Sequence, residues 1–194
     1  MERAEISREL ERYATRHPEE RSTIDRVLEL VARRSDCFSR DCFAPGHLTA
    51  SAWIVSRESR SVLLTHHRKL DRWLQLGGHA DGETDLLAVA LREAREESGL
   101  EDLRVLPAEG RLEILDVDVH VIPARGREPG HEHHDVRFLL EASELQPIRR
   151  QESESKAMSW FRGDRLEVVL EEESLARMAR KAAHWLACSP VGPS

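Results

Sequence analysis

A helix bounded by glycines, with strand-like segments on both sides of it, constrains the fold of this chain most. The segment Gly77–Leu100 reads GGHADGETDLLAVALREAREESGL. Thr84 is the expected N-cap, and Asp85 in the first turn suits the positive end of the helix dipole. Gly99 stands where a left-handed residue commonly ends a helix. Apolar residues at spacings of three and four give this helix one inward stripe: Leu86, Leu87, Ala90, Leu91 and Ala94.

Three glutamates crowd one patch of the predicted helix. Residues three and four apart share a helix face, so Glu93, Glu96 and Glu97 lie together, mostly off the apolar stripe. Such close like charges repel one another, and Mg²⁺ or Mn²⁺, which prefer carboxylate oxygens, would neutralise them. The alternative is a solvated helix face balanced by Arg92 and Arg95. The glycine turn before the helix and the glycine after it favour a metal site for a phosphate-bearing substrate.

The segments around this helix predict an α/β fold with a mixed sheet. Apolar and β-branched patterns predict strands over 47–56, 61–67, 73–76, 112–124, 134–142 and 158–161. Residues 5–35 predict helices, with Pro18 placed to begin the second one, and 165–187 predict one or two closing helices. Strands on both sides of the central helix indicate a sheet with helices on its faces.

Charge and composition exclude several classes of protein. A net charge of −7 disfavours general nucleic-acid binding. We find no run of 18 apolar residues that would predict a membrane span, and no apolar signal-peptide core near the start. Cys37, Cys42 and Cys188 show no pairing pattern, so reduced cysteines and a cytoplasmic location are expected. A zinc site at the first two cysteines would lack a second pair of ligands.

The glycine-bounded helix resembles the Nudix box, the signature of hydrolases that cleave a nucleoside diphosphate linked to another group. The pattern of the family is G-x5-E-x7-R-E-U-x-E-E-x-G-U, with U an aliphatic residue. Counted from Gly78, the matching residues are Arg92, Glu93, Ala94, Glu96, Glu97, Gly99 and Leu100. The first glutamate of the pattern falls on Thr84, and Glu83 stands one residue early. Either Glu83 serves from a shifted turn, or the role of that glutamate is lost.

The resemblance covers roughly residues 47–186 and implies a Nudix-type α/β/α sandwich. LTASAWIVS, SVLLTHHRK, WLQLGGH and ESESKAMSWF are similar to other parts of the family. We accordingly expect an N-terminal helical extension over 1–45, a Nudix hydrolase domain over 46–188 and a C-terminal tail over 189–194. The extension would be a helical cap, a substrate lid or a dimer contact, so a homodimer stays open.

The resemblance implies a metal-dependent hydrolase that cleaves a pyrophosphate bond in a nucleoside diphosphate derivative or a nucleoside triphosphate, by water attack on phosphorus. Its cofactor would be Mg²⁺, with Mn²⁺ as the alternative. The implied metal ligands are a backbone carbonyl near Gly78 and the carboxylates of Glu93, Glu96 and Glu97, and Arg92 belongs to the implied catalytic set. The alternative is a non-hydrolytic Nudix-fold protein that senses a nucleotide or binds a partner. A diphosphate isomerase is a weaker option, because no cysteine is placed as its acid.

The general base and the substrate contacts are harder to assign. In family members, the general base is a residue of the Nudix box or a glutamate on the loop before the W-F strand. In this chain that loop contains Glu152 and Glu154, and Glu154 is the better candidate. Candidate contacts to a small-molecule nucleotide are His79, Arg68 and Glu152. Alternation along a strand places His131 and His133 on one side and His134 on the other, so these three do not form one ligand face. A structural role, a substrate contact and a zinc site all stay open for them.

Overall fold

The computed structural model describes residues 3–106, 113–170 and 172–188, apart from the side chains of residues 164 and 188. The helices are α1 (Arg3–Arg16), α2 (Arg21–Arg33), α3 (Leu86–Ser98), α4 (Asp164–Val169) and α5 (Glu173–Cys188), with a 3-10 turn at Pro18–Glu20. The strands are β1 (Gly46–Ser56), β2 (Val62–His67), β3 (Arg72–Leu74), β4 (Leu76–His79), β5 (Leu103–Leu106), β6 (Asp116–Ile122), β7 (His131–Ala142) and β8 (Ser155–Phe161).

The sheet is built around two long parallel strands. β1 and β7 pair in parallel, from Gly46 opposite Glu132 to Ser56 opposite Ala142. Antiparallel strands flank them: β2 and β4 pair with β1, β5 and β6 pair with β7, and β3 and β8 pair with β2. The predicted mixed sheet is therefore confirmed. The four-residue strand β5 was not predicted, because so short a run carries little periodicity.

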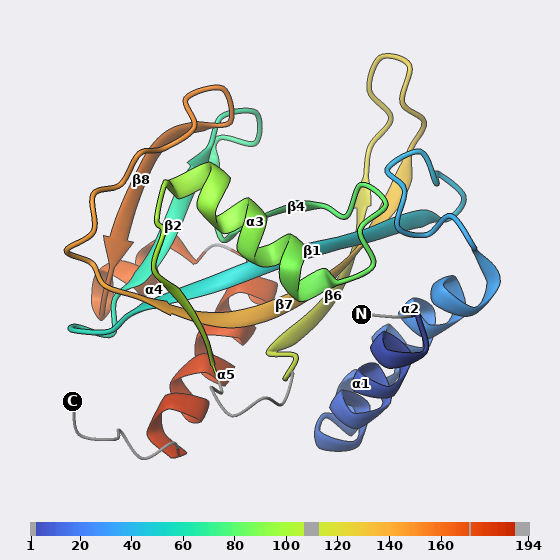
Figure 1. Ribbon diagram of the computed structural model, residues 1–194, viewed down its shortest axis with the longest axis horizontal. Coiled ribbons are helices and arrows are strands. Elements are labelled where there is room, and N and C mark those ends of the chain that lie inside the picture. Colours follow the sequence, from blue (N-terminus) through green and yellow to red (C-terminus); the bar gives the residue numbers. More distant parts are fainter. Residues whose placement is uncertain (1–2, 107–112, 171, 189–194) are drawn as a thin grey trace.

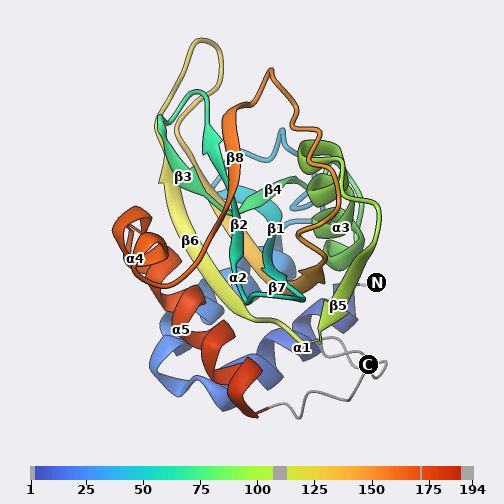
Figure 2. The same ribbon diagram turned by 90° about the vertical axis from the view of Figure 1, so that its left-hand side faces the viewer.

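Helices cover both faces of the sheet, as the sequence predicts (Figure 1). Leu48, Ala50 and Ala52 of β1 pack with α1, α2 and α3 in one core cluster. Trp53 and Val55, from the other face of the same strand, pack with α5 in a second cluster. Figure 2 shows α3 on one side of the sheet and α4 and α5 on the other. Side chains therefore alternate along β1 between the two faces, as the pleat of a strand requires.

Helix α3 begins one residue later than the sequence predicts. Asp85, rather than Thr84, is the N-cap, and its side chain accepts hydrogen bonds from the backbone N–H groups of Leu87 and Ala88, both at 3.2 Å. The expectation for Thr84 was therefore wrong. Gly99 ends the helix as predicted, with φ of 73° and its N–H bonded to the carbonyl of Arg95 at 2.7 Å. Glycine adopts this left-handed conformation without the steric cost that a Cβ would add.

Other predicted segments differ at their ends. The segment 73–76 is divided between β3 and β4, and the strand expected over 112–124 is β6, which begins at Asp116. Residue 112 and the expected tail over 189–194 lie outside the described residues.

Cys37 and Cys42 are buried and free. Within the described ranges, the helices fall short of the length and apolar character that crossing a bilayer requires.

Candidate active site

Two glycines of β4 allow α3 to approach the sheet closely enough to set its glutamates against the backbone. A Cβ added to Gly78 would lie 2.6 Å from both the carboxyl carbon and Oε2 of Glu93. The neighbouring N–H of Gly77 donates a hydrogen bond of 2.8 Å to Oε1 of Glu97. The glycine turn and the glutamate patch, which the sequence places within one segment, are thus in direct contact.

Glu97 is the most buried carboxylate of the patch, with 6% of its surface exposed. This burial is the main reason why its pKa rises to about 8, and the charges of Glu154 and Glu93 raise it further. Burial also raises the pKa of Glu93, against the lowering effect of Arg92, and the charges of Glu96 and Glu154 act in the same direction as burial. A negative charge on Glu93 or Glu97 is therefore costly, and the charge of Glu154 adds to this cost at both residues.

Arg92 positions the patch. Its Nη1 donates to Oε1 of Glu93 at 2.7 Å, and the same nitrogen lies 3.6 Å from Oε2 of Glu96. Its Nη2 donates to the backbone carbonyl of His79 at 3.0 Å. The guanidinium therefore ties α3 to β4 and fixes the Glu93 carboxylate beside Gly78. Glu96 lies at the open side of the patch, with 55% of its side chain exposed.

The loop before β8 brings Glu154 to the helix. Backbone N–H groups of Arg149 and Gln151 donate to the carbonyls of Ser98 and Glu97, at 2.6 and 2.9 Å, so the loop is docked on the end of α3. Arg68 holds the far end of the loop: its backbone N–H donates to the carbonyl of Glu154 at 2.7 Å. These contacts explain how a residue 57 positions after Glu97 reaches the same patch.

The remaining predicted residues have other contacts. The Nε of Arg68 donates to the backbone carbonyl of Glu152 at 2.9 Å, so this guanidinium anchors the loop. The side chain of Glu152 is 81% exposed and lies 3.5 Å from Arg150. Glu83 is exposed, and its carboxylate accepts a hydrogen bond from the N–H of Asp85 at 2.9 Å. Glu83 therefore stabilises the turn that leads into α3. Substrate contacts by Arg68, Glu152 and His79 stay predictions.

The donor set fits a hard divalent cation. The carboxylates of Glu93 and Glu97 lie against the glycines of β4, burial and neighbouring negative charges raise their pKa values, and Arg92 offsets only part of this charge. Mg²⁺ and Mn²⁺ prefer oxygen ligands of this kind, and a cation would remove the repulsion that burial intensifies.

The raised pKa of Glu97 has a consequence for stability. A carboxyl group whose pKa is higher in the folded protein than in the unfolded chain stabilises the fold while it is protonated, and this contribution is lost as the pH rises through the folded value. Without divalent cations, the stability of wild type minus that of Glu97→Gln should fall from about pH 5 to about pH 8, by at most about 1.4 kcal/mol per pH unit.

Denaturant unfolding of both proteins in EDTA measures this difference. Comparison with the variant is needed because burial lowers the pKa of His47 and His133, and these groups make wild-type stability rise with pH over part of the same range. Since both proteins carry these histidines, their effect cancels in the difference. A difference that stays constant between about pH 5 and about pH 8 would contradict the assignment.

The contact between Gly78 and Glu93 gives a second prediction. In Gly78→Ala, the added methyl group would displace the Glu93 carboxylate, which Arg92 otherwise holds in place. We expect the rate of the expected hydrolysis to fall at least about tenfold, since misplacing a positioned group by about 1 Å can lower a catalytic rate about 100-fold. Gly130→Ala is the matched control, because its Cβ would meet atoms only at 3.5 Å or beyond. Equal activities of the two variants would contradict the role given to this contact.

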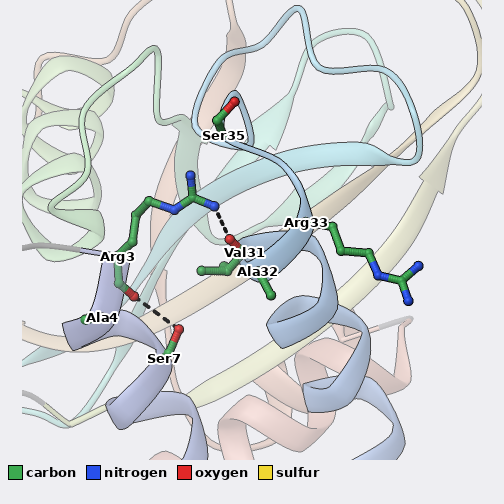
Figure 3. A pocket seen from close by; sticks show the side chains of 7 residues that line it. All are labelled: Arg3, Ala4, Ser7, Val31, Ala32, Arg33 and Ser35. Atoms are coloured by element: carbon green, nitrogen blue, oxygen red, sulfur yellow. Dashed lines mark hydrogen bonds between the residues drawn. The ribbon is translucent and has the colours of Figure 1, made fainter.

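A hollow of about 440 Å³ lies away from the carboxylates, between the start of α1 and the end of α2 (Figure 3). Its lining includes Arg3, Ser7 and Val31, and the Arg3 guanidinium donates to the Val31 carbonyl across it. None of its lining residues belongs to α3, β4 or the loop before β8. We therefore assign it no part in the chemistry.

Comparisons with known proteins identify the family and the fold of this chain. The family model of the NUDIX domain matches residues 45–186. A C. elegans Ap4A hydrolase in a binary complex is similar in structure, with a TM-score of 0.55, 18% identity, and 72% of this chain and 97% of that chain covered. The E. coli dihydroneopterin triphosphate pyrophosphohydrolase has a TM-score of 0.53, 14% identity, and coverage of 73% and 96%.

A NUDIX family hydrolase from Clostridium perfringens gives a TM-score of 0.51 and 21% identity, with 74% of this chain and 98% of that chain covered. At such identities the structural similarity shows the fold alone. Among curated proteins, none matches the chain.

Proposed function

Because the chain belongs to the Nudix hydrolase family, we propose that it hydrolyses a pyrophosphate bond in a nucleoside diphosphate derivative or a nucleoside triphosphate, with the help of a divalent cation. The observation that carries this proposal is the patch formed by Glu93, Glu96 and Glu97 beside the glycines of β4, with Glu154 on the loop docked next to it. Burial makes ionisation of Glu93 and Glu97 costly, and the charge of Glu154 adds to this cost. A polyanionic phosphate would be repelled by this patch unless a cation stood between them.

The residues that would hold the cation are Glu93, Glu96 and Glu97, together with the backbone carbonyl of Gly78. When bound, Mg²⁺ or Mn²⁺ supplies neutralisation of phosphate charge and a bound water of lowered pKa. Arg92 keeps Glu93 turned toward this position through its hydrogen bonds to Glu93 and to the His79 carbonyl. We therefore assign Arg92 a positioning role.

Glu154 is our candidate for the general base. In the proposed reaction, the oxygen of a water molecule attacks phosphorus while Glu154 accepts a proton from that water. The bond from phosphorus to the bridging oxygen then breaks, and the second phosphate leaves with the electron pair of that bond. Docking of the loop on α3 and the contact from Arg68 hold Glu154 in place for this transfer.

A substrate panel tests the proposal. It should include dinucleoside polyphosphates, nucleoside triphosphates, sugar nucleotides, ADP-ribose and coenzyme A, each with Mg²⁺ or Mn²⁺ and with chelator. The names of the similar structures, an Ap4A hydrolase and a dihydroneopterin triphosphate pyrophosphohydrolase, support including the first two classes. We expect cation-dependent release of phosphate-containing products from at least one class. Folded protein that turns over no member of the panel would instead favour a nucleotide-sensing protein.

A further inference from the structure

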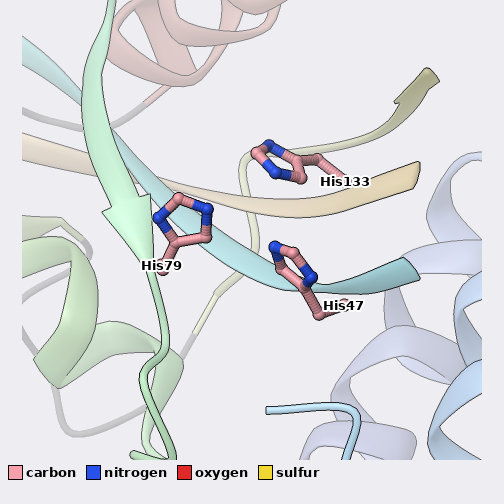
Figure 4. A group of neighbouring side chains, drawn as sticks. All are labelled: His47, His79 and His133. Carbon is pink, nitrogen blue, oxygen red and sulfur yellow. The ribbon is translucent and has the colours of Figure 1, made fainter. Parts of the chain in front are cut away.

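Histidines from three strands gather on the sheet beside the carboxylate patch. His47 of β1, His79 of β4 and His133 of β7 have ring centroids 4.8 to 5.1 Å apart. One ring nitrogen from each lies within 4.8 Å of the corresponding nitrogens of the other two. Figure 4 shows the three rings turned toward one another. We refer to these three residues as the histidine cluster.

Strand register explains this convergence. His47 stands directly opposite His133 in the parallel pair β1 and β7, while His79 stands opposite Thr49 in the pair β1 and β4. His47 and Thr49 are two residues apart, so their side chains lie on the same face of β1. On β4, the Cβ position of Gly78 is directed at Glu93 of α3, and alternation turns the next residue, His79, to the opposite face. The histidine cluster is therefore distinct from the carboxylate patch.

His47 is arranged as a metal ligand would be. Its Nδ1 lies 3.2 Å from the carbonyl oxygen of Cys42, which accepts a hydrogen bond and so fixes the proton on Nδ1. Its Nε2 is left with a lone pair and has no hydrogen-bond partner among the described residues. Water cannot readily supply one, because only 1% of the residue is exposed. Metal-bound histidines commonly donate their second ring N–H to a carbonyl in this way.

The rings of His47 and His133 are neutral at physiological pH, which favours metal binding. Burial lowers the pKa of His47 to about 4 and the pKa of His133 to about 2. Neutral imidazoles keep the lone pairs that a metal needs. His79 and His133 are half-buried, so the cluster is reachable from solvent at one side. An unpartnered buried nitrogen is costly without a ligand, and a metal would remove that cost.

We propose that His47, His79 and His133 bind one divalent transition-metal ion of the Zn²⁺ class. Three imidazoles and no carboxylate suit Zn²⁺, Co²⁺ or Ni²⁺ and disfavour Mg²⁺ and Ca²⁺. Three protein ligands leave a fourth tetrahedral position for water or for an anionic oxygen. A bound ion joins β1, β4 and β7 next to the glycine turn that carries the proposed hydrolytic site.

A second group of potential ligands is less suitable. His17, Glu19 and Glu20 lie close enough together to hold an ion. However, Lys181 already donates to Glu20 at 2.5 Å, and Tyr13 donates to the other oxygen of the same carboxylate. The charge of Glu20 is therefore compensated within the protein, whereas Nε2 of His47 has no such partner.

Cobalt spectroscopy on untagged, metal-stripped full-length protein tests the proposal. Excess Mg²⁺ is present throughout, so that the carboxylate patch does not compete for Co²⁺. We expect a tetrahedral-type visible band that saturates at one equivalent of Co²⁺ and disappears on addition of Zn²⁺. His47→Gln and His133→Gln should weaken Co²⁺ binding at least about 100-fold, whereas Glu97→Gln and His66→Gln should leave the band unchanged.

Circular dichroism shows whether the variants fold. A second measurement uses the wild-type protein alone. Zn²⁺ should protect His79 and His133 of the wild type from acylation by diethyl pyrocarbonate, read by mass spectrometry, and should leave His66 reactive. Zn²⁺ in 100-fold excess over its dissociation constant should also raise Tm by at least about 4 °C. The proposal is overturned if wild type binds no stoichiometric Co²⁺, if the band persists in both histidine variants, or if Zn²⁺ gives no protection.

Discussion

Glu97→Gln should lower kcat for pyrophosphate hydrolysis at least about 1,000-fold, which corresponds to about 4 kcal/mol of transition-state stabilisation. Glu97 is the most buried carboxylate of the patch, and its negative charge is the one that a cation would most need to balance. Glutamine keeps the size of the side chain, and its carbonyl oxygen can still accept the hydrogen bond from Gly77. The substitution therefore removes the charge and leaves the packing in place.

Steady-state kinetics with the best substrate of the panel, at saturating Mg²⁺, measures the effect. Glu101→Gln is the matched control, because Glu101 is an exposed glutamate shortly after the same helix. It should retain wild-type kcat. Thermal unfolding of both variants separates loss of chemistry from loss of fold. If Glu97→Gln is folded and keeps kcat within about threefold of wild type, the assignment of the metal site to α3 is wrong.

Glu154→Gln should lower kcat about 100-fold and leave KM nearly unchanged, because a general base contributes in the transition state rather than in substrate binding. The contacts that carry this expectation are the docking of the loop on α3 and the effect of the Glu154 charge on the pKa of Glu93 and Glu97.

Two outcomes would remove Glu154 from this role. If Glu154→Gln keeps wild-type kcat while Glu97→Gln abolishes turnover, the base is not on the loop. If Glu152→Gln loses more activity than Glu154→Gln, the base is on the loop but was assigned to the wrong residue. The structure favours Glu154, because its charge raises the pKa of Glu93 and Glu97, whereas the carboxylate of Glu152 lies 3.5 Å from Arg150.

Local sequence was sufficient to predict the patch on α3. Glu93, Glu96 and Glu97 lie within five residues of a regular helix, and helix geometry alone puts them together. The same segment shows the limit of local reasoning at its start, where Thr84 and Asp85 both can cap a helix. In the structure Asp85 is the cap, because its carboxylate accepts hydrogen bonds from two backbone N–H groups of the first turn.

Long-range contacts explain what the sequence alone did not predict. Glu154 was a candidate only by resemblance, because its approach to Glu97 depends on hydrogen bonds between a distant loop and the end of α3. His47 shows the same limit. A single histidine at the start of an apolar strand carries no signal until the register of β1 with β7 and β4 is known. That register places it among histidines 32 and 86 positions away.

The most direct test of the central claim is hydrolysis of the best substrate in ¹⁸O-labelled water, with product analysis by mass spectrometry. We expect a single ¹⁸O atom in one phosphate-containing product, formed with Mg²⁺ or Mn²⁺ and absent with EDTA. This result would establish that water attacks phosphorus and that a divalent cation is required. Unlabelled products, or equal rates with and without chelator, would contradict the proposal.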